Sequence, residues 1–288
     1  MALLELFARL SEKYNWRLSV AHFNHQLRGR SSNADERLVA RTAKKLGLRF
    51  VRESADVQEY ASERKLSVEM AARTLRHGFL ARVAARLRIR TVALAHHADD
   101  QVELFFLRLL RGAGGEGLAG MKWQNPSPQN PRILLTRPLL AQSKTDLQNF
   151  AKELGVHFRE DATNAQLDFQ RNRIRHELLP LLAEKYQPAL NRVILRQMDI
   201  LGAEADCVTQ IAKEWLSHPE AFEALPVAVQ RRCLQIQGVE KGVLGHFDLI
   251  ETLRQTPNRP IAVNDSLLVS RDASGILHAH TEAKPSFN

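Results

Sequence analysis

The sequence predicts an α/β fold in which a parallel sheet with helices on both faces is followed by a smaller, mainly helical domain. Up to about residue 180, short apolar segments alternate with longer segments of helical periodicity. This alternation is typical of parallel, doubly wound sheets. Beyond that point the alternation stops and helical patterns dominate. We therefore expect two domains, over residues 1–182 and 183–288.

The first domain is expected to contain strands that alternate with helices. The expected helices are residues 2–13, 33–46, 67–87, 99–111 and 143–154, and the expected strands are residues 18–23, 50–52, 91–95 and 133–135. Ser143 precedes the last helix and Gly155 follows it, which suits the residues that usually cap and end a helix. Residues 122–132 hold three of the eleven prolines, so we expect an exposed loop there.

The second domain is expected to be mostly helical. Its expected helices are residues 188–216, 219–236 and 243–255, and short strands are expected at residues 261–263 and 267–270. No internal repeat is present, and the polar tail over residues 282–288 is expected to be frayed.

The composition indicates a soluble protein with a preference for polyanions. The 288 residues carry a net charge of +9, and 44% of them are hydrophobic, enough for a sizeable core. The basic balance favours nucleic-acid binding, and a generally basic solvated surface is the alternative. No apolar run approaches the roughly 18 residues of a membrane span, and no signal peptide opens the chain. Cys207 and Cys233 do not form a C-x-x-C pair, which favours a reducing cytoplasm.

Residues 94–121 form the most informative stretch of the chain. His96 and His97 follow a predicted strand, and the carboxyl ends of parallel strands are where ligands bind in open α/β sheets. Asp99 and Asp100 then open an apolar helix on which Asp100, Glu103, Leu107 and Arg111 share one face, within about 80°. The alternative is that carboxylates near the helix start and arginines near its end only suit the macrodipole. Imidazoles next to carboxylates favour a site for a nucleotide, a metal or both.

A second polar cluster lies at residues 159–176. Arg171 and Arg175 are four residues apart and are expected on one helix face, whereas Arg173 is expected to point elsewhere. The arginine fork matches phosphate oxygens. The alternative is that Glu160 and Asp161 simply pair with these arginines.

Two further pairs of residues are weaker candidates for a site. His22 and Asn24 lie at the end of the first predicted strand, where Asn24 could also be only a turn former. Glu69 and Arg73 are four residues apart on a predicted helix and could be only a surface ion pair.

Several sequence blocks, in order, resemble those of the bacterial tRNA(Ile)-lysidine synthetases, which belong to the N-type ATP pyrophosphatase (PP-loop) superfamily. The blocks are AHFNHQLRGRSSNADE at 21–36, SVEMAARTLRHGFL at 67–80, the HHADDQ motif at 96–101, RPLL at 137–140, and FREDATNAQLDFQRNRIRHELLPLL at 158–182. The resemblance extends from Met1 to about Leu182. It implies a Rossmann-like, adenine nucleotide alpha hydrolase-like sheet. His77 and Leu104 depart from the tyrosine and threonine expected from the family.

The resemblance implies an ATP-dependent ligase of the cytoplasm that modifies tRNA. The wobble cytidine of a tRNA(Ile) with a CAU anticodon would be adenylated at O2, and L-lysine would then displace AMP from C2 to form lysidine. ATP and Mg²⁺ are the implied cofactors, no membrane is involved, and the resemblance leaves open whether the protein forms a homodimer.

The resemblance also suggests which residues carry these roles. The expected catalytic residues are Asp100, Asp99, His97, Arg111 and Arg173, with Asp100 as the Mg²⁺ ligand. The expected ATP-binding residues are His22, Asn24, Glu69, Arg73 and Arg111. The expected tRNA-binding residues are Arg171, Arg173, Arg175, Arg192 and Arg196.

One departure from the family concerns the phosphate-binding loop. The sequence contains no SGGxDS motif and no other glycine-rich phosphate loop, and residues 1–6 resemble the helix that should follow that motif. Backbone N–H groups of such a loop normally hold phosphates. We therefore expect the first strand and its loop to be missing from an N-terminally truncated sequence. The alternative function is a catalytically degenerate tRNA-binding protein on the same fold.

Overall fold

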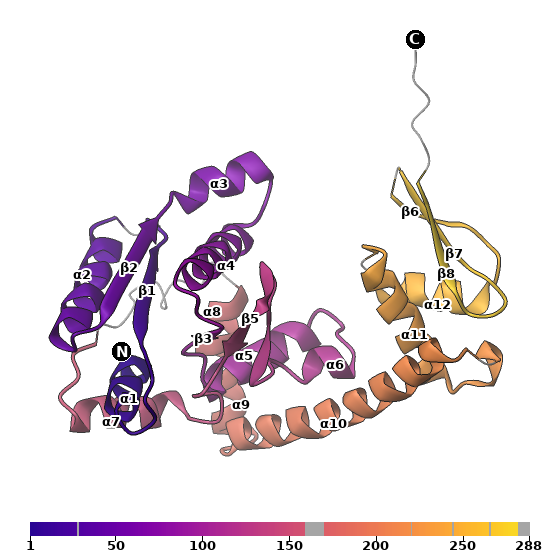
Figure 1. Cartoon of the computed structure of the whole chain (residues 1–288). Coiled ribbons are helices and arrows are strands. Elements are labelled where there is room, and N and C mark those ends of the chain that lie inside the picture. The colour runs from indigo at the N-terminus through magenta and orange to yellow at the C-terminus, as the bar shows by residue number, and fades with distance from the viewer. Residues whose placement is uncertain (28, 159–169, 220, 244, 265, 282–288) are drawn as a thin grey trace, which may run out of the picture. The chain divides into compact units, whose positions relative to one another are not determined.

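The computed structural model describes all residues except 28, 159–169, 220, 244, 265 and 282–288 (Figure 1). The chain forms two compact units. Unit 1 comprises Met1–Gly112 and Gly120–Arg196, and unit 2 comprises Ala113–Ala119 and Gln197–Asn288. Each unit is described by itself below. The functional boundary expected at residue 182 stays a prediction.

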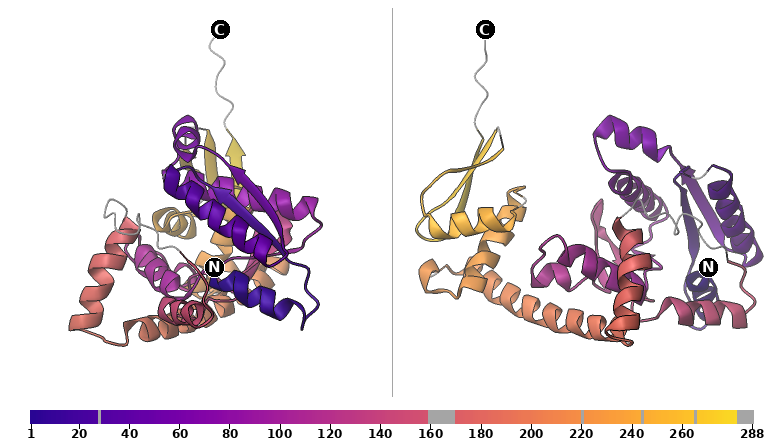
Figure 2. Two further views of the ribbon diagram at one scale, coloured as in Figure 1. Left: turned by 90° about the vertical axis from the view of Figure 1, so that its left-hand side faces the viewer. Right: turned by 180° about the vertical axis from the view of Figure 1, so that it is seen from behind.

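The first sheet of unit 1 has two parallel strands. β1 (Ser19–Asn24) pairs with β2 (Arg49–Ser54), with Val20 opposite Phe50. α1 (Ala2–Ser11) precedes β1, and α2 (Arg30–Lys45) connects the two strands. α2 lies on one side of this sheet and α4 (Val68–Arg86) on the other (Figures 1 and 2). These elements confirm the expected alternation, whereas the short helix α3 (Val57–Arg64) was not predicted.

The second sheet of unit 1 has three strands. β3 (Thr91–Ala93) pairs in parallel with β5 (Asn130–Thr136), and β5 pairs antiparallel with β4 (Gln124–Ser127). The exposed loop predicted over residues 122–132 is therefore partly wrong. Pro126 does not prevent the hairpin, because β4 pairs on one side only and an edge strand tolerates proline.

The expectation of one continuous parallel sheet is also corrected. Among the described residues, β1 and β3 each have a strand on one side only, so the strands form two sheets rather than one. The alternation of elements predicts the strands that are joined by helices, but it predicts neither the hairpin strand β4 nor which strands pair. Helix α1, which precedes the edge strand β1, is also incompletely covered, since none of its residues is fully buried.

Helix α4 joins the two sheets of unit 1 through its apolar side chains. Phe79 and Val83 pack with Phe23 of β1, and Ala81 and Ala84 pack with Ile133 of β5. The same helix therefore contacts both sheets and places its polar residues near the ends of their strands.

The remaining helices of unit 1 are α5 (Ala98–Leu109), α7 (Lys144–Glu153), α8 (Gln170–Arg173), the π-helical turn η2 (Ile174–Leu178), α9 (Leu179–Lys185) and the start of α10 (Leu190–Ser217). Of these, α5 lies between β3 and β4 in the chain and the others follow β5. The predicted cap of α7 is confirmed, because the Asp146 amide donates to Ser143 Oγ at 3.0 Å. Gly155, which follows α7, has a φ of +60°, as expected of a helix-ending glycine.

Unit 2 combines helices with a three-stranded antiparallel sheet. Its elements are α6 (Gly115–Leu118), most of α10, the 3₁₀ turn η3 (Phe222–Ala224), α11 (Val227–Glu240), α12 (Phe247–Gln255), β6 (Ile261–Asn264), β7 (Leu267–Arg271) and β8 (Leu277–Thr281). The helix expected from residue 219 begins only after Pro226, because proline disfavours helical backbone in the residue before it. Both predicted strands are present, and β8 was missed. In the described part of the chain, no helix combines the length and apolarity that crossing a membrane requires.

Candidate active site

The first turn of α5 carries the two aspartates singled out from the sequence. The Asp100 Oδ2 atom accepts a hydrogen bond from the His97 backbone N–H at 3.1 Å, and Asp99 Oδ2 accepts one from the Lys144 backbone N–H at 2.7 Å. Asp99 therefore joins the start of α5 to the start of α7. In each carboxylate, one oxygen accepts a backbone N–H at a helix start. The other oxygen can bind a different partner.

Asp100 and Glu103 form a partly buried ion-pair cluster with two arginines. Arg171 Nη2 donates to Asp100 Oδ1 at 2.8 Å, and Arg171 Nε donates to Glu103 Oε2 at 2.7 Å. Arg175 donates to both oxygens of Glu103, at 2.5 and 2.8 Å. Only 2% of the Glu103 side chain is exposed, so this carboxylate depends on its two partners. We call Asp100, Glu103, Arg171 and Arg175 the paired cluster.

The paired cluster confirms that Arg171 and Arg175 share one face. Burial lowers the pKa of the Arg175 guanidinium, but the hydrogen bonds and negative charge of Glu103 raise it above the usual value. The alternative partners Glu160 and Asp161 lie outside the described residues. In the part that the structure describes, the arginines pair with α5.

A second group of basic side chains lies near the paired cluster, and it differs in having buried nitrogen atoms without a partner among the described residues. It contains Arg76 and His77 of α4, His96 after β3, and Arg137 after β5. The Nε atoms of both arginines and the Nδ1 atoms of both histidines are buried and have no hydrogen-bond partner among the described residues. Arg137 is held by Nη1, which donates to Lys122 O at 2.8 Å and Asn125 Oδ1 at 2.6 Å. We call these four residues the cationic cluster.

The pKa shifts show that the cationic cluster and the paired cluster are close together. Burial lowers the pKa of His96 to about 4; the carboxylate of Asp100 opposes this shift, and the charges of Arg137, Arg76 and Arg171 add to it. Burial also lowers the pKa of His77 to about 4, with a further contribution from Arg76. Burial and the nearby charges of Arg73 and Arg171 lower the pKa of Arg76. Buried guanidinium groups without an acidic partner fit the oxygens of a phosphate.

His97 lies between the two aspartates of α5. Its Nδ1 is 3.6 Å from Asp99 Oδ2, and its Nε2 is 3.5 Å from Asp100 Oδ2. Burial lowers the pKa of His97, but the two carboxylates outweigh burial and raise it above the usual value. The ring and the Lys144 amide in turn lower the pKa of Asp99. His97 is therefore placed for proton transfer beside Asp100.

The other predicted catalytic and phosphate-binding residues belong to neither the paired cluster nor the cationic cluster. Arg111 is exposed just beyond the end of α5, and Arg173 is exposed and pairs with Glu177 at 3.4 Å. Glu69 and Arg73 are exposed on α4, and within the described residues no ion pair joins them. Arg73 nevertheless lies near enough to lower the pKa values of Arg76, His77 and Arg137.

The residues at the end of β1 and those on α10 have more ordinary surroundings. Asn24 is buried, and its Nδ2 donates to Asn33 Oδ1 at 2.9 Å and Glu36 Oε2 at 3.0 Å, so it holds the start of α2. His22 has a pKa lowered by burial. Arg192 and Arg196 are exposed on α10.

The structure brings four residues to this region to which the sequence analysis assigned no role. His96 and Glu103 were noticed within the 94–121 stretch, whereas Arg76 and Arg137 were missed. Glu103 follows Asp100 by three residues. This spacing correctly predicted that the two carboxylates share one face of the helix, but it did not indicate a role for Glu103. Arg137 opens the RPLL block. The signal for Arg76 was absent, because a charge on a helix is usually solvated.

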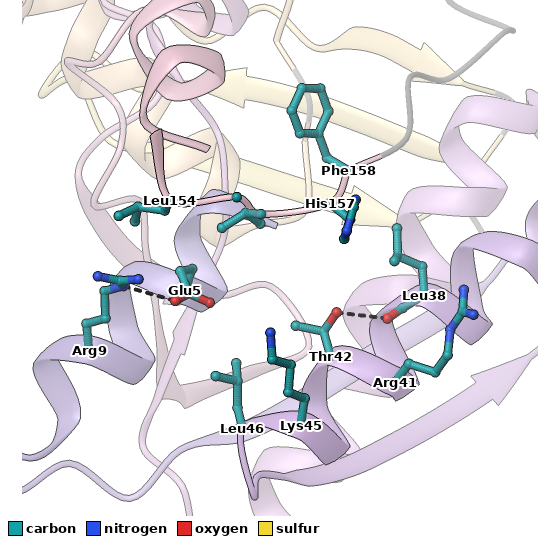
Figure 3. A pocket seen from close by; sticks show the side chains of 12 residues that line it. Glu5, Arg9, Leu38, Arg41, Thr42, Lys45, Leu46, Leu154, His157 and Phe158 are labelled. Carbon is teal, nitrogen blue, oxygen red and sulfur yellow. Dashed lines mark hydrogen bonds and ion pairs between the residues drawn. The ribbon is translucent and has the colours of Figure 1, made fainter. Parts of the chain in front are cut away.

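A cavity elsewhere in unit 1 is not part of this site. Its volume is about 650 Å³, and residues of α1, α2 and the segment after α7 line it, including Arg9, Leu38, Arg41, Leu154 and His157 (Figure 3). It lies at the opposite end of α7 from the residue bonded to Asp99.

Among the described residues, no group of three or more His, Cys, Asp or Glu side chains could hold a metal ion. Asp100 as an Mg²⁺ ligand therefore stays a prediction.

The parallel strands define a protein of the α/β class, and its candidate site is formed by polar residues that follow the carboxyl ends of these strands. A family model described as the PP-loop domain matches residues 1–182. The chain belongs to the PP-loop domain family, which implies ATP as its nucleotide.

The chain is also similar to curated proteins named tRNA(Ile)-lysidine synthase. It is 39% identical to the one from Geobacter sulfurreducens, over 98% of this chain and 63% of that protein. It is 36% identical to the one from Dehalococcoides mccartyi, over 74% of this chain and 46% of that protein. The chain thus spans less than two thirds of the length of these relatives.

Among solved structures, the chain is similar to the U34-tRNA thiolase NcsA from Methanococcus maripaludis with its [4Fe-4S] cluster. The TM-score is 0.54 and the identity is 15%, over 70% of this chain and 68% of that one. At this identity the likeness shows the fold alone, and it agrees with the α/β assignment.

Proposed function

We propose that this protein ligates L-lysine to C2 of the wobble cytidine of a CAU-anticodon tRNA(Ile), with ATP as the energy source. The names of its relatives support the reaction. The observation that carries the proposal for this chain is the proximity of two unlike groups, the carboxylates of the paired cluster and the arginines of the cationic cluster, whose Nε atoms have no partner among the described residues. A ligase that joins an amine to a phosphate-activated base needs both.

The reaction proceeds in two steps in this proposal. Cytidine O2 attacks the α-phosphate of ATP, the bond to the β-phosphate oxygen breaks, and pyrophosphate leaves. The lysine ε-amine then attacks C2, the C2–O2 bond breaks, and AMP leaves while the amine loses a proton. The first step concentrates negative charge on phosphate, and the second requires a neutral amine.

The cationic cluster is assigned to the phosphates. Arg76 and Arg137 approach from α4 and the end of β5, and each keeps a buried Nε without a partner in the described residues. His96 is neutral at physiological pH because its pKa is about 4, so it accepts or donates one hydrogen bond without adding charge. These residues would bind the α-phosphate and stabilise AMP as it leaves, with Arg73, Arg111 and Arg173 as the further phosphate ligands expected from the sequence.

The α5 carboxylates are assigned to the lysine. Asp100 is the predicted residue that orients the amine, and Glu103 supports it by fixing Arg171 and Arg175. His97 bridges Asp99 and Asp100 and would accept the proton that the amine loses. Because the pKa of His97 is raised, the step that needs its neutral form should speed up as the pH rises through that value.

The nucleotide and metal predictions fit the described residues to different degrees. The cationic cluster fits ATP phosphates, with His22, Asn24, Glu69 and Arg73 as the further ATP-binding residues predicted. Mg²⁺ commonly binds through one or two carboxylates together with substrate phosphates, and Asp100 is the predicted protein ligand.

The tRNA is assigned to the arginines near and beyond the paired cluster: Arg171, Arg173, Arg175, Arg192 and Arg196. The cytidine must be unstacked to reach the site. The division into a catalytic domain over residues 1–182 and a tRNA-binding domain over residues 183–288, a cytoplasmic location and a homodimer belong to the same proposal.

The test is ATP-dependent incorporation of labelled lysine into a CAU-anticodon tRNA(Ile) transcript. The chain should be assayed as it stands and with a strand and SGGxDS loop fused before Met1. Asp100→Asn should abolish incorporation and spare tRNA binding, whereas Asp146→Asn, at the exposed start of α7, should leave both unchanged.

Incorporation by either form, lost in Asp100→Asn, supports the proposal. No incorporation by either form, with tRNA binding intact, would favour the alternative of a degenerate tRNA-binding protein.

A further inference from the structure

The chain between α5 and β4 enters unit 2 and returns. Residues Ala113–Ala119 pack with unit 2, whereas the residues on both sides belong to unit 1. Gly112 and Gly120 flank this segment with φ values of +74° and +79°, a backbone conformation that favours glycine. We call Gly112–Met121 the strap.

The middle of the strap is fixed inside unit 2. An ion pair joins Glu116 to Arg232 of α11, and Arg232 Nε also donates to Thr209 Oγ1 of α10 at 2.9 Å. The backbone of α6 approaches α10 closely, because a Cβ added at Gly115 would lie 3.9 Å from Leu201 O. The segment is thus anchored by charge and by packing.

The returning end of the strap is fixed to α5. Gln101 is 6% exposed, and its side-chain amide forms two hydrogen bonds with one residue of the strap. The Met121 N–H donates to Gln101 Oε1 at 2.7 Å, and Gln101 Nε2 donates to Met121 O at 3.0 Å. Arg108 Nη1 adds a bond to Gly120 O at 3.2 Å.

Gln101 directly follows Asp100 in the first turn of α5. Because the donor and the acceptor of the Gln101 amide are both bonded to Met121, we expect the Gln101 side chain to move with the strap. A shift of the strap would therefore be felt at Gln101, and through it at the carboxylate of Asp100 that the proposed function assigns to the lysine.

We propose that Gln101 is a positioning residue, and that the strap transmits the packing of Ala113–Ala119 in unit 2 to the first turn of α5. The inference rests on the proposed function only for its effect on lysine. The mechanical link itself stands on the contacts of Gln101, Met121, Glu116 and Arg232.

The first test compares Gln101→Met with Gln237→Met in the full chain. Gln237 is an almost exact counterpart in unit 2, because it is 5% exposed, donates to Gly275 O at 3.0 Å and accepts from the Leu277 N–H at 2.9 Å. Both variants should lose about 2–8 °C in Tm, because Gln101→Met loses two hydrogen bonds and Gln237→Met loses three, the third being its bond to Cys233 O at 3.3 Å. Only Gln101→Met should speed hydrogen exchange in the first turns of α5, by about tenfold.

The second test acts on the far end of the strap. Glu116→Gln removes an ion pair that does not touch α5, and it should speed exchange in α5 by about two- to fivefold. Glu223→Gln is the matched control, since Glu223 is also exposed and pairs with an arginine of unit 2, Arg271, at 2.6 Å. It should leave α5 unchanged.

The double variant Gln101→Met/Glu116→Gln separates transmission from two independent effects. If the strap transmits, the double variant exchanges in α5 no faster than Gln101→Met alone, because the link is already broken. If Glu116→Gln leaves α5 unchanged, or if the two effects multiply, the proposal is wrong.

Lysine kinetics give the functional outcome. Gln101→Met and Glu116→Gln should both lower kcat while the KM for ATP stays within about twofold, and Gln237→Met should change neither. Because hydrogen exchange needs no substrate, the strap is tested even if the chain does not form lysidine. If the proposed function is wrong, lysine is not incorporated but the hydrogen-exchange results still hold. If the strap proposal is wrong, the hydrogen-exchange results themselves fail.

Discussion

The two groups of charges in unit 1 differ in whether their members have partners. In the paired cluster, the carboxylates of Asp100 and Glu103 are bonded to Arg171 and Arg175 at 2.5–2.8 Å. In the cationic cluster, Arg76 and Arg137 keep buried Nε atoms without a partner in the described residues. The paired cluster is explained by the protein alone. The cationic cluster carries a desolvation cost that the described chain offsets only in part, through the two bonds of Arg137 Nη1, and the unpartnered Nε atoms point to a ligand.

The largest expected effect comes from breaking the paired cluster. Glu103→Gln leaves two arginines facing a neutral amide and should lower the free energy of unfolding by about 3 kcal/mol. Urea unfolding would measure this change, with Glu177→Gln, which loses only an exposed pair with Arg173, as the control. Equal losses of unfolding free energy in Glu103→Gln and Glu177→Gln would contradict the prediction, because they would show that the buried pairs contribute no more than the exposed pair.

Acid should destabilise the cationic cluster more than the paired cluster. The folded chain holds His77 neutral down to about pH 4, whereas the unfolded chain protonates this histidine near pH 6.5. The unfolded state thus binds the extra proton, and the free energy of unfolding should fall by about 3 kcal/mol between pH 6.5 and pH 4 from this residue.

His77→Phe should remove that part of the pH dependence, and the exposed His218→Gln should not. The measurement is urea unfolding at several pH values from 4 to 7. An unchanged slope in His77→Phe would mean that this histidine is already protonated in the folded state.

Removing a cation from the cationic cluster should cost binding rather than stability. Arg76→Met should change the free energy of unfolding by less than about 1 kcal/mol, because it also removes an unpaired buried charge. It should weaken binding of inorganic pyrophosphate, measured by calorimetry, by about tenfold or more. Arg82→Met, an exposed position on the same helix, is the control. Unchanged affinity in Arg76→Met would separate this residue from phosphate binding.

The smallest expected effect on stability is at Arg173, which belongs to neither cluster. Arg173→Gln removes an exposed pair and should change the free energy of unfolding by less than about 0.5 kcal/mol. If Arg173 contacts a tRNA phosphate, the slope of log affinity against log salt should fall by about 1, whereas Arg64→Gln on α3 should leave it unchanged. An unchanged slope in both would remove Arg173 from the tRNA-binding set.

The sequence predicted those elements that depend on local signals. Ser143 and Gly155 bound α7 as expected, because capping and a positive φ are properties of single residues. The same holds for the parallel direction of β1 relative to β2 and of β3 relative to β5, which follows from the helices that connect them. The hairpin of β4 was missed because prolines usually mark a loop.

The candidate site was predictable only along α5. Asp99, Asp100 and His97 stood out because they adjoin one another after a strand. Arg171 and Arg175 were identified as sharing a face, but their partner Glu103 lies 68 positions earlier than Arg171 in the chain. No spacing rule connects residues so far apart. Arg76 and Arg137 are recognisable only once burial is known, since a solvated arginine and a buried one have the same letter.

The open edges of β1 and β3 have a practical consequence for handling the protein. Within the described residues, each of these strands pairs on one side only, so each presents a row of backbone donors and acceptors that another extended chain can match. Such edges promote strand-to-strand association between molecules. The fraction of oligomers in solution should therefore grow with protein concentration, and it should shrink when a short peptide of alternating valine and threonine occupies those edges.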